Sequence, residues 1–205
     1  MALILGTSAA SAGAQTPSGP APTSVHFIQY GVAIVGEATV SGGDVCPADA
    51  TAPCIIGSGG GLAIRIGYRA REPWFVAGAY EFSRQDAANL LRLAILQQVR
   101  ADARYYFDHG DRLTPYLAGS LGAAFYGNEF SSQTGGVTAF FGGGVEYQLS
   151  EATVIGAAAG YRPFMFRGWT DTTGQRRADR YLGFGFAHFA ALELILEVRD
   201  ALGRW

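Results

Sequence analysis

The segment Gln97–Phe107, QQVRADARYYF, alternates between charged and apolar residues from Val99 to Tyr105. Arg100, Asp102 and Arg104 occupy every second position, and the positions between them are apolar. Residues two apart lie on the same face of a β-strand, so the segment predicts a strand with one charged face and one apolar face. The fold of the chain then depends on which face meets water.

Similar alternating segments recur along the chain, separated by turn-forming residues. They predict eight strands, at about 25–40, 61–70, 74–84, 91–107, 114–128, 137–149, 153–169 and 181–199. Three connections are short, at 71–73, 109–112 and 150–152, whereas the connections between them are mostly longer and richer in glycine and polar residues. Short turns at one end and longer loops at the other are typical of an up-and-down antiparallel barrel in an outer membrane.

The two faces of these strands indicate which side meets lipid. The chain is 49% hydrophobic and only 16% charged, and eight apolar faces would overfill the interior of a small barrel. The alternative is a soluble lipocalin-like barrel, with polar residues outside and an apolar cavity. Glycines on the polar faces favour a narrow polar interior, because they leave room for long charged side chains. These are Gly142, Gly144, Gly156, Gly160, Gly183 and Gly185. We therefore predict an all-β fold, an eight-stranded antiparallel up-and-down transmembrane β-barrel with its apolar faces toward lipid.

Aromatic residues on the apolar faces gather near the strand ends. Tyr68, Trp74, Tyr105, Phe107 and Tyr147 fall at the short-turn end. Tyr80, Phe82, Phe125, Trp169 and Phe184 fall toward the long-loop end. Two such girdles are expected where rings lie at both lipid–water interfaces.

The phrases ARYYF…TPYLAGSLGAAFYG and FFGGGVEYQLS resemble the small eight-stranded outer-membrane barrels of the outer membrane protein A transmembrane type. The resemblance covers most of residues 25–199. It rests on the strand pattern and on the quoted order of aromatic residues, turn, Pro-Tyr pair and glycine-rich stretch. It implies the bacterial outer membrane as the location, and it identifies architecture better than activity.

The sequence predicts three parts of the chain. Residues 1–14 read as an export signal ending in Ala12-Gly13-Ala14, residues 15–24 as a Pro-rich linker, and residues 25–205 as the barrel. An even number of strands with short periplasmic turns predicts that both chain termini face the periplasm and that loop 41–60 is extracellular. A short helix within 190–205 is an alternative to the last strand.

Cys46 and Cys54 flank a short glycine-rich loop. An exported chain meets an oxidising compartment, so we expect a disulfide between them. Two cysteines without a nearby histidine make a poor zinc site, and no metal or cofactor is predicted.

Charged residues on the polar faces carry both signs in nearly equal number. The predicted lumen network is Glu37, Arg65, Arg69, Glu81, Arg92, Arg100, Asp102, Arg104, Glu146, Arg162, Glu193 and Glu197, joined by Arg199. Charges in a narrow interior are tolerable when they are paired, so we expect a plug of salt bridges, with Asp102 flanked by Arg100 and Arg104. The alternative is a charged passage for a small solute.

His188 is the other candidate, because it falls on the lipid face. Some lipid A deacylases are eight-stranded barrels with a catalytic His there and a Ser two residues later. Here that second position is Ala190, so the nucleophile is missing. A bulge or an interfacial position explains His188 better.

The predicted function is a non-enzymatic outer-membrane protein with a structural or surface-interaction role. Its partners are outer-membrane lipid and lipopolysaccharide, and envelope proteins through loops 41–60, 85–90, 129–136 and 170–180. The net charge of −2, with no basic patch, argues against nucleic acid. A narrow channel and a lipid A-modifying enzyme are the alternatives.

Overall fold

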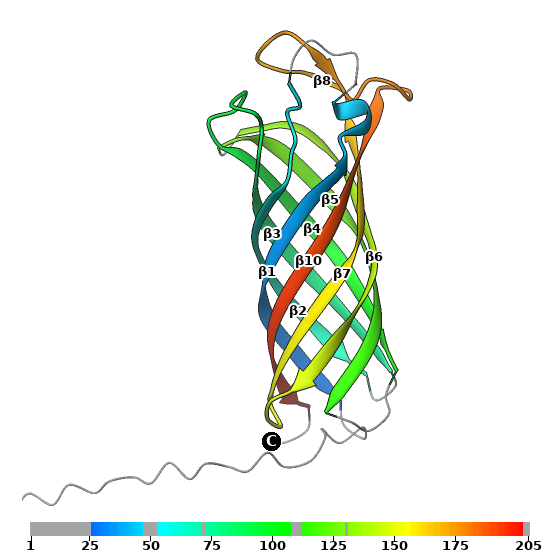
Figure 1. Ribbon diagram of the computed structural model, residues 1–205. Helices are drawn as coiled ribbons and strands as arrows, with labels where there is room; N and C mark the ends of the chain where they lie inside the picture. The colour runs from blue at the N-terminus through cyan, green and yellow to red at the C-terminus, as the bar shows by residue number, and fades with distance from the viewer. Residues whose placement is uncertain (1–25, 47–52, 71–72, 108–111, 130, 203–205) are drawn as a thin grey trace, which may run out of the picture.

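The computed structural model describes residues 26–46, 53–70, 73–107, 112–129 and 131–202. The predicted export signal and linker lie outside these residues. Within them, eight strands close into a barrel in the order β1-β10-β7-β6-β5-β4-β3-β2, with every neighbouring pair antiparallel (Figure 1). The predicted fold class is confirmed. Among the described residues, no helix is long and apolar enough to cross a membrane.

The barrel strands are long and tilted, as Figure 1 shows. They are β1 (Phe27–Ser41), β2 (Gly59–Arg69), β3 (Trp74–Gln85), β4 (Ala94–Tyr106), β5 (Leu113–Asn128), β6 (Ser131–Gln148), β7 (Thr153–Arg167) and β10 (Phe184–Ala201). A two-residue hairpin pair, β8 (Trp169–Thr170) and β9 (Arg176–Arg177), and a short 3₁₀ turn, Gly43–Val45, lie outside the wall. Strand β10 returns beside β1 and closes the barrel.

The connections define two ends of the barrel. The loop end carries the connections 42–58, 86–93, 129–130 and 168–183. The turn end carries 70–73, 107–112 and 149–152, together with the start of β1 and the end of β10 (Figure 1). In outer-membrane barrels the longer connections face the outside.

Several strand limits differ from the prediction. Strands β5 and β6 continue to Asn128 and Ser131, so most of the predicted loop 129–136 is strand. Strand β4 begins at Ala94, three residues later than expected. The alternative of a helix after residue 190 is wrong for the described residues, because β10 continues to Ala201.

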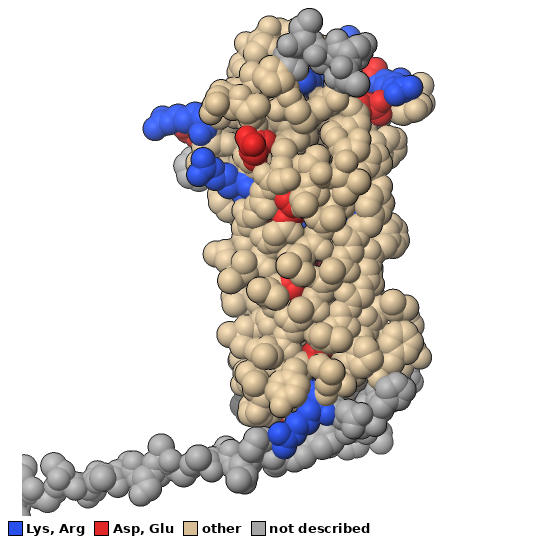
Figure 2. Space-filling view, viewed as in Figure 1, with Lys and Arg blue, Asp and Glu red and all other residues tan. Residues whose placement is uncertain are grey.

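The outside of the barrel is apolar around its middle. Ile34, Leu62, Ile64, Leu121 and Phe141 each leave more than half of their surface exposed. Figure 2 shows a belt of mostly uncharged atoms around the middle, with a few small acidic patches visible between them and the basic groups near the two ends. All the predicted girdle aromatics are exposed except Trp169, which is buried because β8 folds over the loop end. An apolar belt of this kind is stable only against lipid.

An apolar cluster closes the loop end, and we call it the cap. It comprises Val45, Ile55, Ile56, Ala87, Leu91, Ala94, Leu96, Ala124, Tyr126, Phe164, Phe166, Trp169, Ala178, Ala187 and Phe189. Its members come from the connections 42–58, 86–93 and 168–183 and from the inward faces of the strand ends. The cap therefore covers the charged lumen below it.

Candidate functional site: the charged lumen

Six arginines and six acidic residues face the lumen in the described part of the chain, so its formal charge is balanced. They are Arg65, Arg69, Arg100, Arg104, Arg162 and Arg199, with Glu37, Glu81, Asp102, Glu146, Glu193 and Glu197. All are buried except Arg69, whose side chain is 14% exposed. They come from seven of the eight barrel strands, because strand alternation turns every second residue inward.

Arg162 on β7 joins three carboxylates below the cap. Its Nη1 atom lies 2.8 Å from Glu37 Oε1 and 2.7 Å from Glu81 Oε1, and its Nη2 atom lies 2.8 Å from Glu193 Oε1. The side chain is fully buried, and its guanidinium lies 5.5 Å from the centre of the Phe140 ring. Glu37 also accepts hydrogen bonds from neutral side chains, those of Ser83, Gln85 and Gln98.

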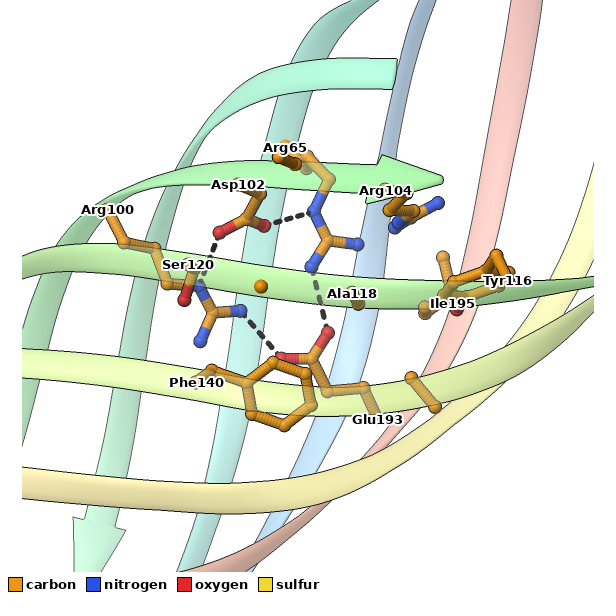
Figure 3. Close-up of a pocket in the computed structure, with 13 residues that line it drawn as sticks. Arg65, Arg100, Asp102, Arg104, Tyr116, Ala118, Ser120, Phe140, Glu193 and Ile195 are labelled. Atoms are coloured by element: carbon orange, nitrogen blue, oxygen red, sulfur yellow. Dashed lines mark hydrogen bonds and ion pairs between the residues drawn. The ribbon is translucent and has the colours of Figure 1, made fainter. Parts of the chain in front are cut away.

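The middle of the network connects strands on opposite sides of the lumen. Figure 3 shows Asp102 between Arg65 and Arg100, and Glu193 facing the same two arginines. Asp102 pairs with Arg65 Nε at 2.8 Å and with Arg100 Nε at 3.2 Å. Glu193 accepts from Arg65 Nη2 at 2.8 Å and from Arg100 Nη2 at 2.7 Å.

The expected neighbour Arg104 does not pair with Asp102. It points toward the turn end, where Nη2 and Nη1 donate to the two carboxylate oxygens of Glu197 at 2.9 and 3.0 Å. The prediction that Arg100 and Arg104 flank Asp102 is therefore correct only for Arg100. The second partner is Arg65 on β2, which reaches Asp102 from beyond the intervening strand β3.

Glu146 is the centre of the network at the turn end. Arg69 lies 2.8 Å from it, Arg199 also donates to it, and the Tyr106 hydroxyl donates to it at 2.9 Å. The Arg69 guanidinium stacks 3.7 Å above the centre of the Tyr106 ring. The charges at this end are thus paired as well.

Three of the polar-face glycines lie against aromatic rings as well as against the backbone of a neighbouring strand. A Cβ atom at Gly142 or Gly160 would lie 2.7 Å from the Phe140 ring, and one at Gly144 would lie 2.7 Å from the Tyr116 ring. Arg162 and Arg104 lie over these two rings, at 5.5 and 5.1 Å from their centres. The glycines therefore make room for the two rings, and the arginines lie on these rings.

Arg92 is a correction to the predicted set. It precedes the first residue of β4, so strand alternation does not apply to it. Its side chain is 87% exposed at the loop end and pairs with Glu129 at 3.3 Å.

Little space remains between the paired charges. One cavity of about 20 Å³ lies among Arg65, Arg100, Asp102, Ser120 and Glu193 (Figure 3). A volume of this size holds about one water molecule. The lumen at this level is therefore filled by side chains.

A disulfide and two hydrogen bonds hold the cap in place. The predicted disulfide Cys46–Cys54 is confirmed, with Cα atoms 4.9 Å apart. The backbone of this loop joins the next connection through Gly57 N, which donates to the Asp86 carbonyl at 2.6 Å. The carbonyl of Ile55 accepts from the buried Tyr126 hydroxyl.

A buried ion pair within connection 168–183 was missed by the sequence analysis. Arg177 Nε donates to Asp171 Oδ2 at 2.9 Å, and Arg177 Nη2 donates to the Pro53 carbonyl at 3.1 Å. Burial favours the neutral acid, but hydrogen bonds from Thr173 and Arg177 hold the pKa of Asp171 below its usual value. The connection has no regular alternation, so no sequence signal pointed to this pair.

His188 lies on the outside of β10, opposite Ser41, where the register of β1 shifts between Thr39 and Ser41. Its Nδ1 atom is 2.5 Å from the Tyr161 hydroxyl, and the two rings stack with centres 5.9 Å apart. This hydrogen-bonded pair fits an interfacial position.

A barrel that is apolar outside and filled with paired charges inside defines a membrane-spanning barrel of the outer-membrane class. The chain matches the outer membrane protein beta-barrel domain family over residues 1–188 and belongs to it. Its location is the bacterial outer membrane, as predicted.

Two solved structures are similar in fold. Neisserial surface protein A shares 19% identity and a TM-score of 0.51, with 85% of this chain and 95% of that chain covered. The outer membrane protein OprG from Pseudomonas aeruginosa shares 14% identity and a TM-score of 0.51, with 86% and 96% covered. A comparison with curated proteins finds no match.

Proposed function

We propose that this protein is a non-enzymatic outer-membrane barrel that is closed to solutes and serves a structural or surface-interaction role. The observation that carries the proposal is the filled lumen, where the cavity among the central ion pairs measures about 20 Å³. A hydrated ion needs a continuous water path, and a cavity for one water does not provide it. The cap adds a second barrier above the charges.

Planar-bilayer conductance tests the closed lumen. The folded protein should give no resolvable single-channel current. Reducing the Cys46–Cys54 disulfide should leave the current absent, because the charge network below the cap still fills the lumen. Stepwise currents from the folded, oxidised protein would favour the narrow channel instead.

The interaction role is supported by exposed apolar residues in connection 168–183. Leu182 is fully exposed at the tip of connection 168–183, and its neighbour Tyr181 is 54% exposed. Leu182 also holds a left-handed backbone conformation, with φ of 51°. Two adjacent exposed apolar side chains at a loop tip offer a contact surface to a protein partner.

Photo-crosslinking on intact cells tests this surface. A photoreactive residue in place of Leu182 should form adducts with other envelope proteins. The same residue at Leu194, which is 53% exposed on the belt, serves as the control and should react with lipid alone. Identical adduct patterns at the two positions would contradict an interaction through connection 168–183.

A further inference from the structure

A polar hollow of about 320 Å³ lies at the loop end, between the end of β3 and the connection that follows it. We call it the rim pocket. Its polar lining comes from Ser58, Arg84, Gln85, Asp86, Asn89 and Arg92. In Figure 2, positively charged side chains project beside this connection, at the upper left and above the uncharged belt.

The position of Arg84 places the pocket at the height of lipid headgroups. Arg84 shares the outward face of β3 with Tyr80 and Phe82, which are each 39% exposed. Two strand residues span roughly 6–7 Å, so Arg84 lies just beyond the last aromatic residue of the girdle. Girdle aromatics mark the lipid–water interface, and the next outward residue therefore meets the headgroup layer.

The charges in the pocket are predominantly positive. Arg84 is exposed and forms no ion pair within the part of the chain that the structure describes. Arg92 forms one loose surface pair, at 3.3 Å from Glu129, with 87% of its side chain exposed. The one acidic residue in the lining, Asp86, accepts a hydrogen bond from the backbone N–H of Ala88 at 2.9 Å.

The neighbours of Arg84 leave it accessible from the lipid side. Its partner on β2 is Gly60, which has no side chain, and its partner on β4 is the buried Ile95. The Arg84 guanidinium forms no ion pair among the described residues and can turn toward a lipid headgroup. Arginine suits this role because its planar N–H groups bind phosphate oxygens in pairs.

We propose that the rim pocket binds a phosphate group, held between Arg84 and Arg92, and that an outer-leaflet lipid headgroup or a free phosphate carries it. The site shares with the proposed function only the placement of the loop end at the outer surface. It does not depend on a closed lumen or on a protein partner.

Native mass spectrometry of the folded full chain in non-ionic detergent tests the proposal. The probes are diphosphoryl lipid A, lipid A stripped of both phosphates, and inorganic phosphate. The folded protein should retain diphosphoryl lipid A in preference to the dephosphorylated form. Losing the charge-assisted hydrogen bonds of one exposed arginine raises the Kd about tenfold. Arg84→Gln and Arg92→Gln should therefore each weaken the binding of diphosphoryl lipid A by about that factor.

Arg176→Gln is the matched control. Arg176 is also an exposed loop-end arginine, 71% exposed and paired with Asp179, but it lies outside the rim pocket. Its replacement removes the same charge and should leave lipid A binding unchanged. The heat-modifiable gel shift of each variant shows that it is folded.

The outcomes separate the two phosphate sources. Displacement of lipid A by millimolar inorganic phosphate would support a site for the phosphate group alone, and retention of lipid A would support the lipid headgroup as the carrier. Equal binding of phosphorylated and dephosphorylated lipid A would overturn the proposal. An equal loss in Arg84→Gln and Arg176→Gln would overturn it too, because the effect would then be one of overall charge. A conducting barrel would overturn the proposed function and leave this result unaffected.

Discussion

Arg162→Met should lower the free energy of unfolding by about 3–5 kcal/mol, the range for removing one partner of a buried ion pair. Methionine keeps an unbranched apolar side chain but removes the charge that three carboxylates share. Glu193 and Glu81 would still contact Arg100, at 2.7 Å in each case. Glu37 would lose its one ion-pair partner among the described residues and keep only neutral donors. The expected loss therefore comes mainly from the stranded Glu37 carboxylate.

A second substitution tests this reasoning. Glu37→Gln keeps the hydrogen-bonding capacity of the side chain and removes its charge. Combined with Arg162→Met, it should recover part of the lost stability, with a coupling free energy on the order of 1–3 kcal/mol. Arg92→Met is the control, because Arg92 belongs to an exposed pair and should cost less than about 1 kcal/mol.

Urea unfolding in lipid vesicles measures all four variants, with the heat-modifiable gel shift as a second readout. A loss from Arg162→Met no larger than that from Arg92→Met would refute the view that the lumen is a stabilising ion-pair network. A double variant that is less stable than Arg162→Met alone would refute the assignment of the loss to Glu37.

Three further predictions concern other parts of the molecule. Leu194→Arg, on the lipid-facing belt, should destabilise by roughly 2–4 kcal/mol in urea unfolding, whereas Ser131→Arg at the loop end should be nearly neutral; equal effects would contradict the lipid-facing assignment. Reducing Cys46–Cys54 should leave the heat-modifiable gel shift of the barrel unchanged, because the loop lies outside the strands, and loss of that shift would show that the disulfide supports the barrel itself. The pKa of Asp171 is lower in the folded state, so its stabilising effect is complete above the usual carboxyl pKa of about 4 and declines as the pH falls through the lowered value. The buried tryptophan of the cap should therefore become accessible to a fluorescence quencher below about pH 4, and Asp171→Asn should abolish that pH dependence.

Alternation in the sequence was enough to determine the class of fold and the direction of most side chains. The two-residue period is a local property of each strand, so the inward set could be read from single segments such as Gln97–Phe107. The outward direction of the apolar faces followed from their number and from the glycines on the polar faces. The wrong prediction of an inward Arg92 has the same local origin, because the predicted strand begins three residues before the observed first residue of β4.

Only the tertiary structure decided which charges meet. Asp102 pairs with Arg65 and Arg104 with Glu197, because long side chains cross the lumen and the partners depend on how the tilted strands are staggered around the barrel. Closure also brings connections that are far apart in sequence to the same end. There the cap forms and the Asp171–Arg177 pair is buried. These contacts depend on the arrangement of several irregular segments at once, and no periodic pattern in one segment encodes them.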